Sequence, residues 1–289
     1  MEGVGVVLSL NKNNLHKRVL TVQGAHGAHR QTYWVAAELP QAQRTLRFDS
    51  GDRTKPKTAT VSPKDRVSIH YGLLFSKQAN AGVSHAIEAV GKVHSVPKDL
   101  YKLPVKVTGS LGGANGMYKI RQPFGGNEIN VSKWSVHPSS TAAHEYGHFL
   151  DHHLFGDGKP TIRGFASIKW ATGQPEGKEV APLMRALYKS DAARKLTAKH
   201  RDNVRIGDDH GQQYTQYLLM PPEMLARAYA QYIGLRASKE IHQGTREYGE
   251  RWRHHGYHAQ WDDKDFEPIA REFDRLFQRR GLLRHRRTS

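Results

Sequence analysis

Two histidines and a glutamate with helical spacing are the residues of this sequence best suited to chemistry. They are His144, Glu145 and His148, in the order His-Glu-x-x-His. Because an α-helix advances about 100° per residue, positions four apart lie on the same face, and both imidazoles can bind one metal ion. Glu145 lies beside the first of them, where its carboxylate can accept and release protons. The pattern is typical of zinc metalloproteases.

The residues around the pattern predict a helix that carries it. Ser139, Ser140 and Thr141 follow Pro138 and offer N-cap hydroxyls, and Gly156 is suited to end the helix. Apolar residues among the metal-binding positions supply a surface that packs against the rest of the protein. The alternative interpretation is an exposed, histidine-rich helix that binds no metal.

A catalytic zinc site needs a third protein ligand, because zinc usually takes three side chains and a water. Asp151 lies on nearly the same face as the histidines, but each residue moves it about 1.5 Å along the axis. Asp151 therefore suits a positioning role better than direct ligation, and His152, eight residues after His144, stays open as a candidate. The position ten residues after His144 is Leu154, which excludes the class of protease that takes its third ligand there.

A second candidate for the third ligand is Glu223, which lies in a later helix. Pro222 favours the first helical position, and Glu223 follows in the first turn, where a carboxylate also meets the helix dipole favourably. Arg227, one turn later, is placed to orient that carboxylate or to form an ion pair elsewhere. Spacing alone leaves two interpretations open, a metal ligand or an ordinary acidic residue at a helix start.

Together these two segments resemble a known family. The sequence from Thr141 to Asp151 (TAAHEYGHFLD), followed about seventy residues later by Pro222 to Ile233 (PEMLARAYAQYI), is similar to the zincin-type metallopeptidase domain of phages and mobile elements, the large polyvalent protein-associated metallopeptidase domain. The resemblance includes the Gly-rich segment 110–118, residues 128–132 and residues 261–277. It covers roughly residues 75–280.

The resemblance implies a fold, a cofactor and a reaction. The expected fold is α+β, with a zincin-like core of one small mixed sheet, the His-Glu-x-x-His helix and a helix that bears the glutamate. The family implies Zn²⁺ held by His144, His148 and Glu223, as in gluzincins, with Glu145 as the catalytic base. It also implies hydrolysis of peptide bonds in a protein or peptide substrate, by a protein that a phage or mobile element encodes.

Two further parts of such a site are expected from the sequence. A donor must stabilise the oxyanion of the reaction, and His210, Tyr214 and Tyr217 all precede Glu223 closely. We select Tyr217 as the second catalytic residue. The strand expected at residues 127–132 is proposed as a sheet edge that receives an extended substrate.

The pattern of hydrophobic residues predicts three regions along the chain. Residues 1–72 form a β-rich N-terminal region of unknown role, with strands at 4–10, 18–23, 33–39, 45–49 and 58–62. Residues 73–280 form the metallopeptidase domain, with helices at 79–93, 179–200, 222–235 and 266–278 and strands at 104–108, 117–121 and 127–132. Residues 208–210 are read as a loop. Residues 281–289 form a basic tail.

Composition restricts the remaining properties. The formal net charge is +17, and Arg279, Arg280, Arg284, Arg286 and Arg287 crowd the C-terminus, which leaves two interpretations open, a contact with nucleic acid or another polyanion and a solvated tail that aids solubility. No apolar run is long enough to span a membrane, and residues 1–10 lack the features of a secretory signal. We therefore expect no membrane contact, and a location in the cytoplasm of a bacterial host or in a virion.

Three rival functions are weighed against the protease. A zinc nucleobase deaminase needs a cysteine pair, and the sequence contains no cysteine. A two-metal nuclease favours clusters of acids, of which only Asp208 and Asp209 are an example. The remaining rival is a non-catalytic virion or DNA-associated protein with a structural or vestigial zinc site. Glu145 argues against it, because a structural site has no need of that carboxylate.

Overall fold

The computed structural model describes residues 59–70, 77–109, 111–120 and 126–284 in full, and the backbone of residues 15–24 and 27–36. The chain divides into two compact units, Met1–Asp52 with Gly112–Ala114, and Arg53–Leu111 with Asn115–Ser289. In the first unit, β1 (Leu15–Gly24) and β2 (Gly27–Ala36) form an antiparallel hairpin. The strands predicted at 18–23 and 33–39 fall on this hairpin in large part. Those predicted at 4–10 and 45–49 lie outside the described residues.

The second unit contains a four-stranded mixed sheet in the order β4-β6-β8-β7. The strands β4 (Val67–His70), β6 (Leu103–Thr108) and β8 (Glu128–Ser132) are parallel, and β7 (Gly116–Lys119) is antiparallel to β8. β8 is thus an interior strand, and the prediction that residues 127–132 form a sheet edge is wrong. The edge on that side of the sheet is β7.

The second unit also includes residues that were expected to belong to the N-terminal region, in the four-stranded sheet and in a separate strand pair. β4 pairs with β6, Val67 lying opposite Leu103, and β3 (Thr60–Val61) pairs with β5 (Val96–Pro97). The second unit therefore begins at Arg53, before the boundary expected at residue 72. At the other end Leu282 is buried and Leu283 forms a bridge with His94, so the start of the expected tail packs on the domain.

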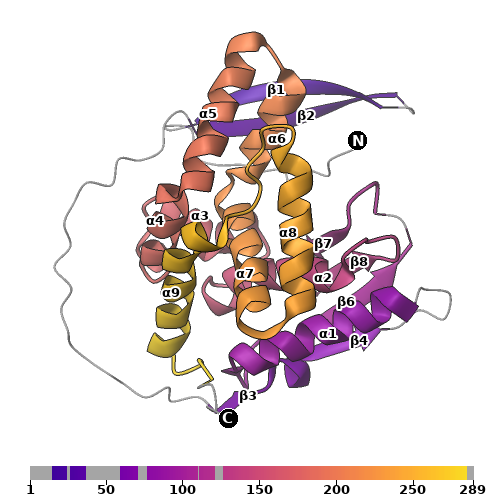
Figure 1. Cartoon of the computed structure of the whole chain (residues 1–289), viewed down its shortest axis with the longest axis vertical. Helices are drawn as coiled ribbons and strands as arrows, with labels where there is room; N and C mark the ends of the chain where they lie inside the picture. Colours follow the sequence, from indigo (N-terminus) through magenta and orange to yellow (C-terminus); the bar gives the residue numbers. More distant parts are fainter. Residues whose placement is uncertain are drawn as a thin grey trace. The chain divides into compact units, whose positions relative to one another are not determined.

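The helices lie on one side of the sheet, where they form a helical layer (Figure 1). Their bounds are α1 (Lys77–Val93), α2 (Pro138–Phe149), α3 (Ala166–Ala171), α4 (Ala181–Lys189), α5 (Asp191–Ile206), α6 (Asp209–Leu218), α7 (Pro221–Ala237), α8 (Lys239–Arg253) and α9 (Asp263–Arg279). Short turns of other helix types are η1 (Pro63–Arg66), η2 (Leu150–Leu154), η3 (Ile162–Gly164) and η4 (Pro175–Lys178). The helices predicted at 79–93, 222–235 and 266–278 are confirmed as α1, α7 and α9.

Two predictions about the helices are wrong. The single helix expected at 179–200 is broken at Ser190, which caps α5 by accepting a hydrogen bond from the Ala193 N–H. The segment 208–210, read as a loop, begins α6: the Asp208 side chain accepts from the Gly211 N–H and so caps that helix. Within the described residues, no helix has both the length and the apolar character needed to cross a membrane.

The core explains how the helices are held on the sheet. Leu103 and Val105 of β6 and Ile129 and Val131 of β8 are fully buried, and α1 and α2 pack against β8. On the helical side, large aromatic residues fill the space around α7 and α9, namely Tyr146, Tyr229, Tyr232, Phe273 and Phe277. Burial of this apolar surface is the main force that fixes the α+β arrangement.

A buried histidine lies in this core. His94 is 0% exposed and its ring stacks on Phe277 with centroids 4.0 Å apart. Its Nδ1 lies 2.9 Å from the Ser95 carbonyl oxygen, and its Nε2 lies 2.7 Å from the Tyr229 hydroxyl. Burial lowers the pKa of His94 from 6.5 to about 4. The ring is therefore neutral, donating to the carbonyl and accepting from the phenol.

The lowered pKa of His94 predicts that the folded protein loses stability in acid. The unfolded imidazole takes up a proton near pH 6.5 and the buried one only near pH 4, so its contribution is present above pH 6.5 and is lost as the pH falls toward 4. The loss is about 3 kcal/mol of unfolding free energy. Urea unfolding of metal-free protein across this range should show a shallower pH dependence for His94→Gln than for the unaltered chain. Parallel curves for the two proteins would contradict the assignment.

Candidate metal centre

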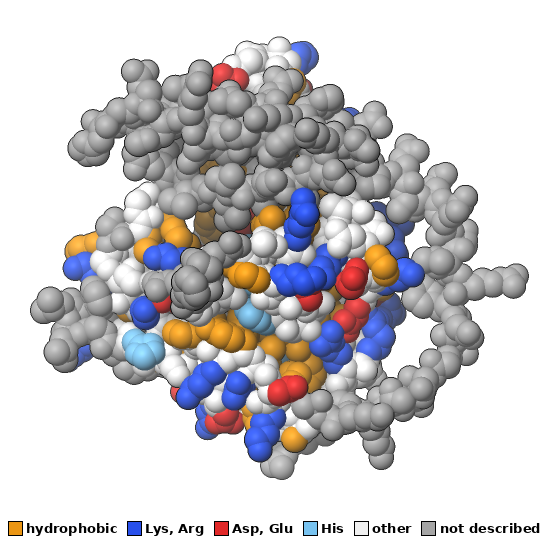
Figure 2. Space-filling view, turned by 180° about the vertical axis from the view of Figure 1, so that it is seen from behind, with side chains coloured by type: hydrophobic (Ala, Val, Ile, Leu, Met, Phe, Trp, Pro, Cys, Tyr) orange, Lys and Arg blue, Asp and Glu red, His pale blue; other side chains and the backbone are white. Residues whose placement is uncertain are grey.

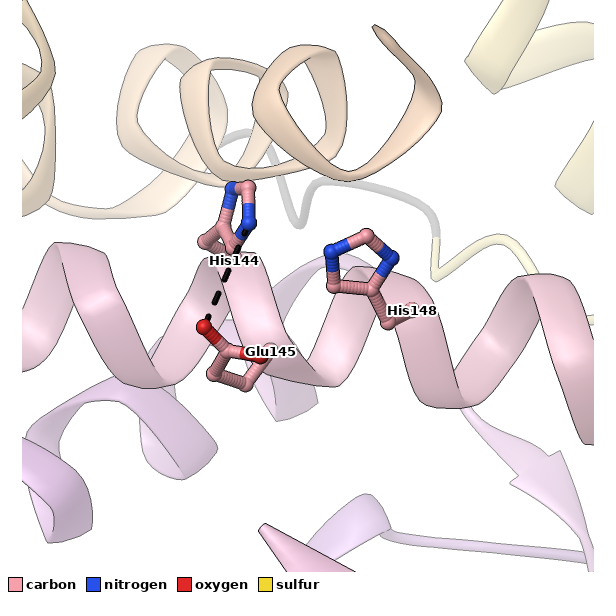
Figure 3. A group of neighbouring side chains, drawn as sticks. All are labelled: His144, Glu145 and His148. Carbon is pink, nitrogen blue, oxygen red and sulfur yellow. Dashed lines mark ion pairs between the residues drawn. The ribbon is translucent and has the colours of Figure 1, made fainter. Parts of the chain in front are cut away.

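Helix α2 places His144 and His148 on one face. The helix begins at Pro138 after His137, so the predicted N-cap hydroxyls at residues 139–141 lie inside its first turn, a correction to the sequence analysis. The opposite face of α2 is buried and anchors the helix through Ala142, Ala143, Tyr146 and Phe149. Figure 3 shows both imidazoles projecting from the same side of α2, with Glu145 beside His144.

Helix α7 brings Glu223 to these imidazoles. Pro221 begins the helix and Glu223 lies in its first turn, as the sequence predicts. The Glu223 Oε2 atom lies 3.5 Å from the Nε2 of His144 and 3.5 Å from the Nε2 of His148. Glu223 is 4% exposed, so its carboxylate is withdrawn from solvent and directed into the site.

Close packing of the two helices makes this approach possible. A Cβ atom at Gly147 would lie 2.9 Å from the Ala226 Cα and 3.2 Å from the Ala226 carbonyl oxygen. Only glycine fits at such a distance, so α2 and α7 contact each other nearly backbone to backbone. Glu223 lies one turn before Ala226 on α7, and His148 directly follows Gly147 on α2.

The donor atoms fit the size and chemistry of zinc. Ligands about 2.0–2.1 Å from a tetrahedral zinc ion lie about 3.4 Å from one another, close to the two separations between Glu223 and the imidazoles. Ligand atoms of His144, Glu145 and His148 also lie within 4.8 Å of one another. Two imidazoles and one carboxylate form a donor set that zinc accepts in hydrolases.

Asp151 and His152 form hydrogen bonds with residues outside the cluster of His144, His148 and Glu223. Asp151 is fully buried and accepts hydrogen bonds from the backbone N–H and the hydroxyl of Ser167, and so caps the start of α3. Burial raises the pKa of Asp151 to about 6, although the bonds from Ser167 oppose the rise. His152 has a partner at each ring nitrogen, the Tyr118 hydroxyl at 2.8 Å and the Lys159 carbonyl oxygen at 2.6 Å. Neither residue contributes to the cluster around Glu223.

Glu145 has the surroundings of a proton acceptor. It is 6% exposed, and its Oε1 lies 4.0 Å from the His144 Nε2. Burial raises the pKa of Glu145 above its usual value, against the effects of the two imidazoles and of the nearby Tyr118 N–H. A raised pKa brings a carboxylate closer to the range in which it can both take and return a proton.

The charge of Glu223 is set by groups of opposite sign. Burial alone would raise its pKa, but His144 and His148 hold the pKa of Glu223 well below its usual range. In turn, burial lowers and Glu223 raises the pKa of His144, with a net rise. The Arg227 Nε lies 3.5 Å from the Glu223 Oε1, with both side chains buried. Arg227 is itself held by the carbonyl oxygens of Leu218 and Ala259.

Of the three candidate oxyanion donors, Tyr217 alone is placed at the centre. It lies in the last turn of α6, and burial and the nearby Glu223 carboxylate hold its pKa well above the usual value. The residue is nevertheless 41% exposed, so one side of its ring faces solvent beside the site. Tyr214, one turn earlier, bonds instead to the Tyr248 hydroxyl at 3.1 Å. His210 is exposed at the far end of α6.

Two residues near the centre were not anticipated. The backbone N–H of Tyr118, in β7, lies near Glu145 and lowers the pKa of its carboxyl group. Tyr248, on α8, joins Tyr214 close enough to Glu223 for the carboxylate to raise the pKa of its phenol, after burial as the larger cause. A backbone donor leaves no mark in a sequence, and Tyr248 lies beyond the second motif, so no local signal pointed to either residue.

The arginines near the C-terminus are partly engaged within the fold. Arg280 forms two hydrogen bonds with the Glu179 carboxylate, at 2.6 and 2.5 Å, and Arg279 lies 3.4 Å from the Glu179 carbonyl oxygen. Arg286 and Arg287 lie outside the described residues. On the face shown in Figure 2, Lys and Arg side chains are interspersed with acidic and hydrophobic ones. Contact of the C-terminus with a polyanion stays a prediction.

With this geometry established, comparison with known proteins adds no relative. Protein families, curated proteins and solved structures were each searched, and none matches this chain.

Proposed function

We propose that the protein is a zinc-dependent peptidase with the catalytic plan of a zincin. The observation that carries the proposal is the convergence of Glu223, from α7, on both imidazoles of the His-Glu-x-x-His helix at 3.5 Å. Two segments about seventy-five residues apart thereby form one three-ligand set, with an unligated glutamate next to it. This supports the zincin-like core and the gluzincin ligand set that the sequence resemblance implies.

The proposed reaction assigns a task to each side chain. His144, His148 and Glu223 would hold the metal, and zinc bound there lowers the pKa of a bound water to about 7 and polarises a carbonyl group. Glu145 accepts a proton from the attacking water and delivers it to the leaving amine as the C–N bond breaks. Tyr217 donates its hydroxyl proton as a hydrogen bond to the oxygen on which negative charge develops. Arg227, whose Nε lies 3.5 Å from the Glu223 Oε1, helps to orient Glu223.

Substrate backbone is proposed to bind along β7. This strand is the antiparallel edge of the sheet next to α2, and its Tyr118 N–H reaches Glu145. An extended peptide added to a sheet edge gains backbone hydrogen bonds and is aligned over its length. Such an arrangement would carry the scissile bond past Glu145 and the ligand set.

A cleavage assay with controlled metal content tests the function. Zinc-loaded protein is incubated with a mixed peptide library, and new termini are identified by mass spectrometry. We expect cleavage that disappears on treatment with a chelator and returns on addition of zinc. Absence of any cleavage by protein shown to contain one zinc would overturn the proposal.

The rival function predicts a different experimental result. A non-catalytic DNA-associated protein would bind DNA with a strong salt dependence and cut no peptide. The burial of Glu145 beside the imidazoles favours the enzyme, because a buried acid that binds no metal is costly unless it has another role. Encoding by a phage or mobile element, and location in a bacterial cytoplasm or a virion, stay predictions from the resemblance.

Removal of the Tyr217 hydroxyl provides a prediction about the transition state. Tyr217→Phe should lower kcat by about 10²-fold or more, with little change in KM or zinc content, because the lost bond forms mainly as charge develops. Steady-state kinetics on a cleaved peptide measures this. Tyr214→Phe, on the same helix but bonded to Tyr248, is the matched control and should retain most of the activity. Equal losses in both variants would contradict the assignment.

A further inference from the structure

His152 lies in a position that connects the end of the motif helix to the edge strand. It belongs to η2, the turn that directly follows α2, and it is 0% exposed. Its ring stacks on Phe165, with centroids 4.8 Å apart and planes 25° apart. Each ring nitrogen has a polar partner from a different part of the chain, Tyr118 of β7 on one side and Lys159 on the other.

The partners fix which ring nitrogen carries the proton. The Lys159 carbonyl oxygen can only accept, so the His152 Nε2, 2.6 Å away, must be the donor. In a neutral ring the Nδ1 then has a free lone pair, and the Tyr118 hydroxyl at 2.8 Å donates to it. The Asn127 amide nitrogen, 3.4 Å from the same Nδ1, is a second donor on that side. Burial lowers the pKa of His152, in agreement with a neutral ring.

Tyr118 transmits this arrangement to the candidate centre. Its side chain bonds to His152, and its backbone N–H lies near enough to the Glu145 carboxylate to lower the pKa of that group. β7 passes very close to α2 at this point, since a Cβ atom at Gly116 would lie 2.8 Å from the Glu145 Oε1. The strand β7 thus meets the motif segment at two points, since Tyr118 bonds to His152 after the helix and Gly116 lies against Glu145 within it.

We propose that His152 is a positioning residue: as a neutral imidazole it holds Tyr118, and through Tyr118 the register of the edge strand β7 against Glu145. The inference rests on the proposed function for its kinetic consequence only. If β7 slides or tilts, its close approach to Glu145 is lost and the strand proposed to align the substrate moves away. His152 itself touches neither substrate nor metal.

Hydrogen exchange on the metal-free protein tests the positioning role independently of catalysis. The variants are His152→Asn and Tyr118→Phe, with His153→Asn as the matched control, because His153 is adjacent but bonds to Asn127 at 2.6 Å instead. We expect the Tyr118 amide to exchange about tenfold faster in the first two variants, the effect of losing one buried hydrogen bond, with β6 and β8 unchanged. The control should match the unaltered chain at β7.

Kinetics on the zinc-loaded protein supplies the second measurement. We expect His152→Asn and Tyr118→Phe to lower kcat about tenfold or more with zinc content retained, and the double variant to be no worse than either single one. His152→Gln, whose amide reaches toward the Nε2 position, tests for partial rescue.

The outcomes separate the two proposals. Unchanged exchange at the Tyr118 amide in both His152→Asn and Tyr118→Phe, or a uniform rise over the whole sheet, would overturn the positioning role and leave His152 as a packing residue. If the unaltered zinc protein cuts no peptide, the proposed function fails, whereas the exchange measurement still decides whether His152 holds β7.

Discussion

Glu145→Gln is expected to lower the rate of peptide hydrolysis by about 10²–10⁴-fold while zinc remains bound, the range assigned to loss of a general base. Glutamine has nearly the same shape but cannot accept the water proton. His144, His148 and Glu223 are unchanged, so the ligand set stays complete. The measurement compares cleavage rates at neutral pH with the zinc content of the same samples.

The exposed residue Glu250, on α8, supplies the matched control for this prediction. Glu250→Gln makes the same chemical change on the surface, where Glu250 pairs with Arg246 at 3.2 Å. We expect full activity for that variant. A Glu145→Gln protein that cuts peptides at the unaltered rate would remove the proton acceptor from the proposed reaction.

Glu223→Gln should have a different result, with loss of the metal itself. Changes around a metal site that spare its ligands already cost about 10–100-fold in affinity, so removal of a charged ligand should cost more than about 100-fold. The variant also leaves the buried guanidinium of Arg227 without its carboxylate partner, 3.5 Å away. Breaking a buried pair in this way typically costs about 3–5 kcal/mol of stability.

Competition titration with a zinc indicator and urea unfolding of metal-free protein measure the two effects. Glu145→Gln serves as the comparison, because it alters a second buried glutamate beside the same imidazoles and should keep the metal. Unchanged zinc affinity in Glu223→Gln would mean that Glu223 is not a ligand, and the three-ligand set would no longer hold.

The local parts of the site could be predicted from the sequence. The face of α2 follows from residue spacing, and the start of α7 follows from adjacent prolines, since both depend on a few neighbouring residues. That Glu223 could be a ligand was one of two open interpretations of its position. Only the packing of α7 on α2, through Gly147 and Ala226, places it at 3.5 Å from both imidazoles.

The errors concern contacts between distant residues. The break between α4 and α5 is stabilised from far along the chain, because Asp265 accepts hydrogen bonds from the backbone N–H groups of Asp191 and Ala192, and the Trp261 Nε1 donates to the Ser190 Oγ at 2.8 Å. Strand order also depends on distant residues. Apolar and polar residues alternate at 127–132, which predicts a strand, but this pattern does not indicate that β7 will pair with its free side and become the edge of the sheet. Strand order therefore has no local signature, whereas the Ser190 cap of α5 is a local signal that favours a helix start.

The glycine contact between α2 and α7 also bears on how the proposed zinc site would gain and lose its ion. Small zinc domains fold only when the ion arrives, because nothing else joins their ligands. Here a backbone-to-backbone helix pair inside a large aromatic core joins them already, so the cradle is preorganised. The ion can therefore be withdrawn and replaced in a folded protein, and cobalt(II), which absorbs visible light in such sites, can report on the empty and filled forms of the same chain.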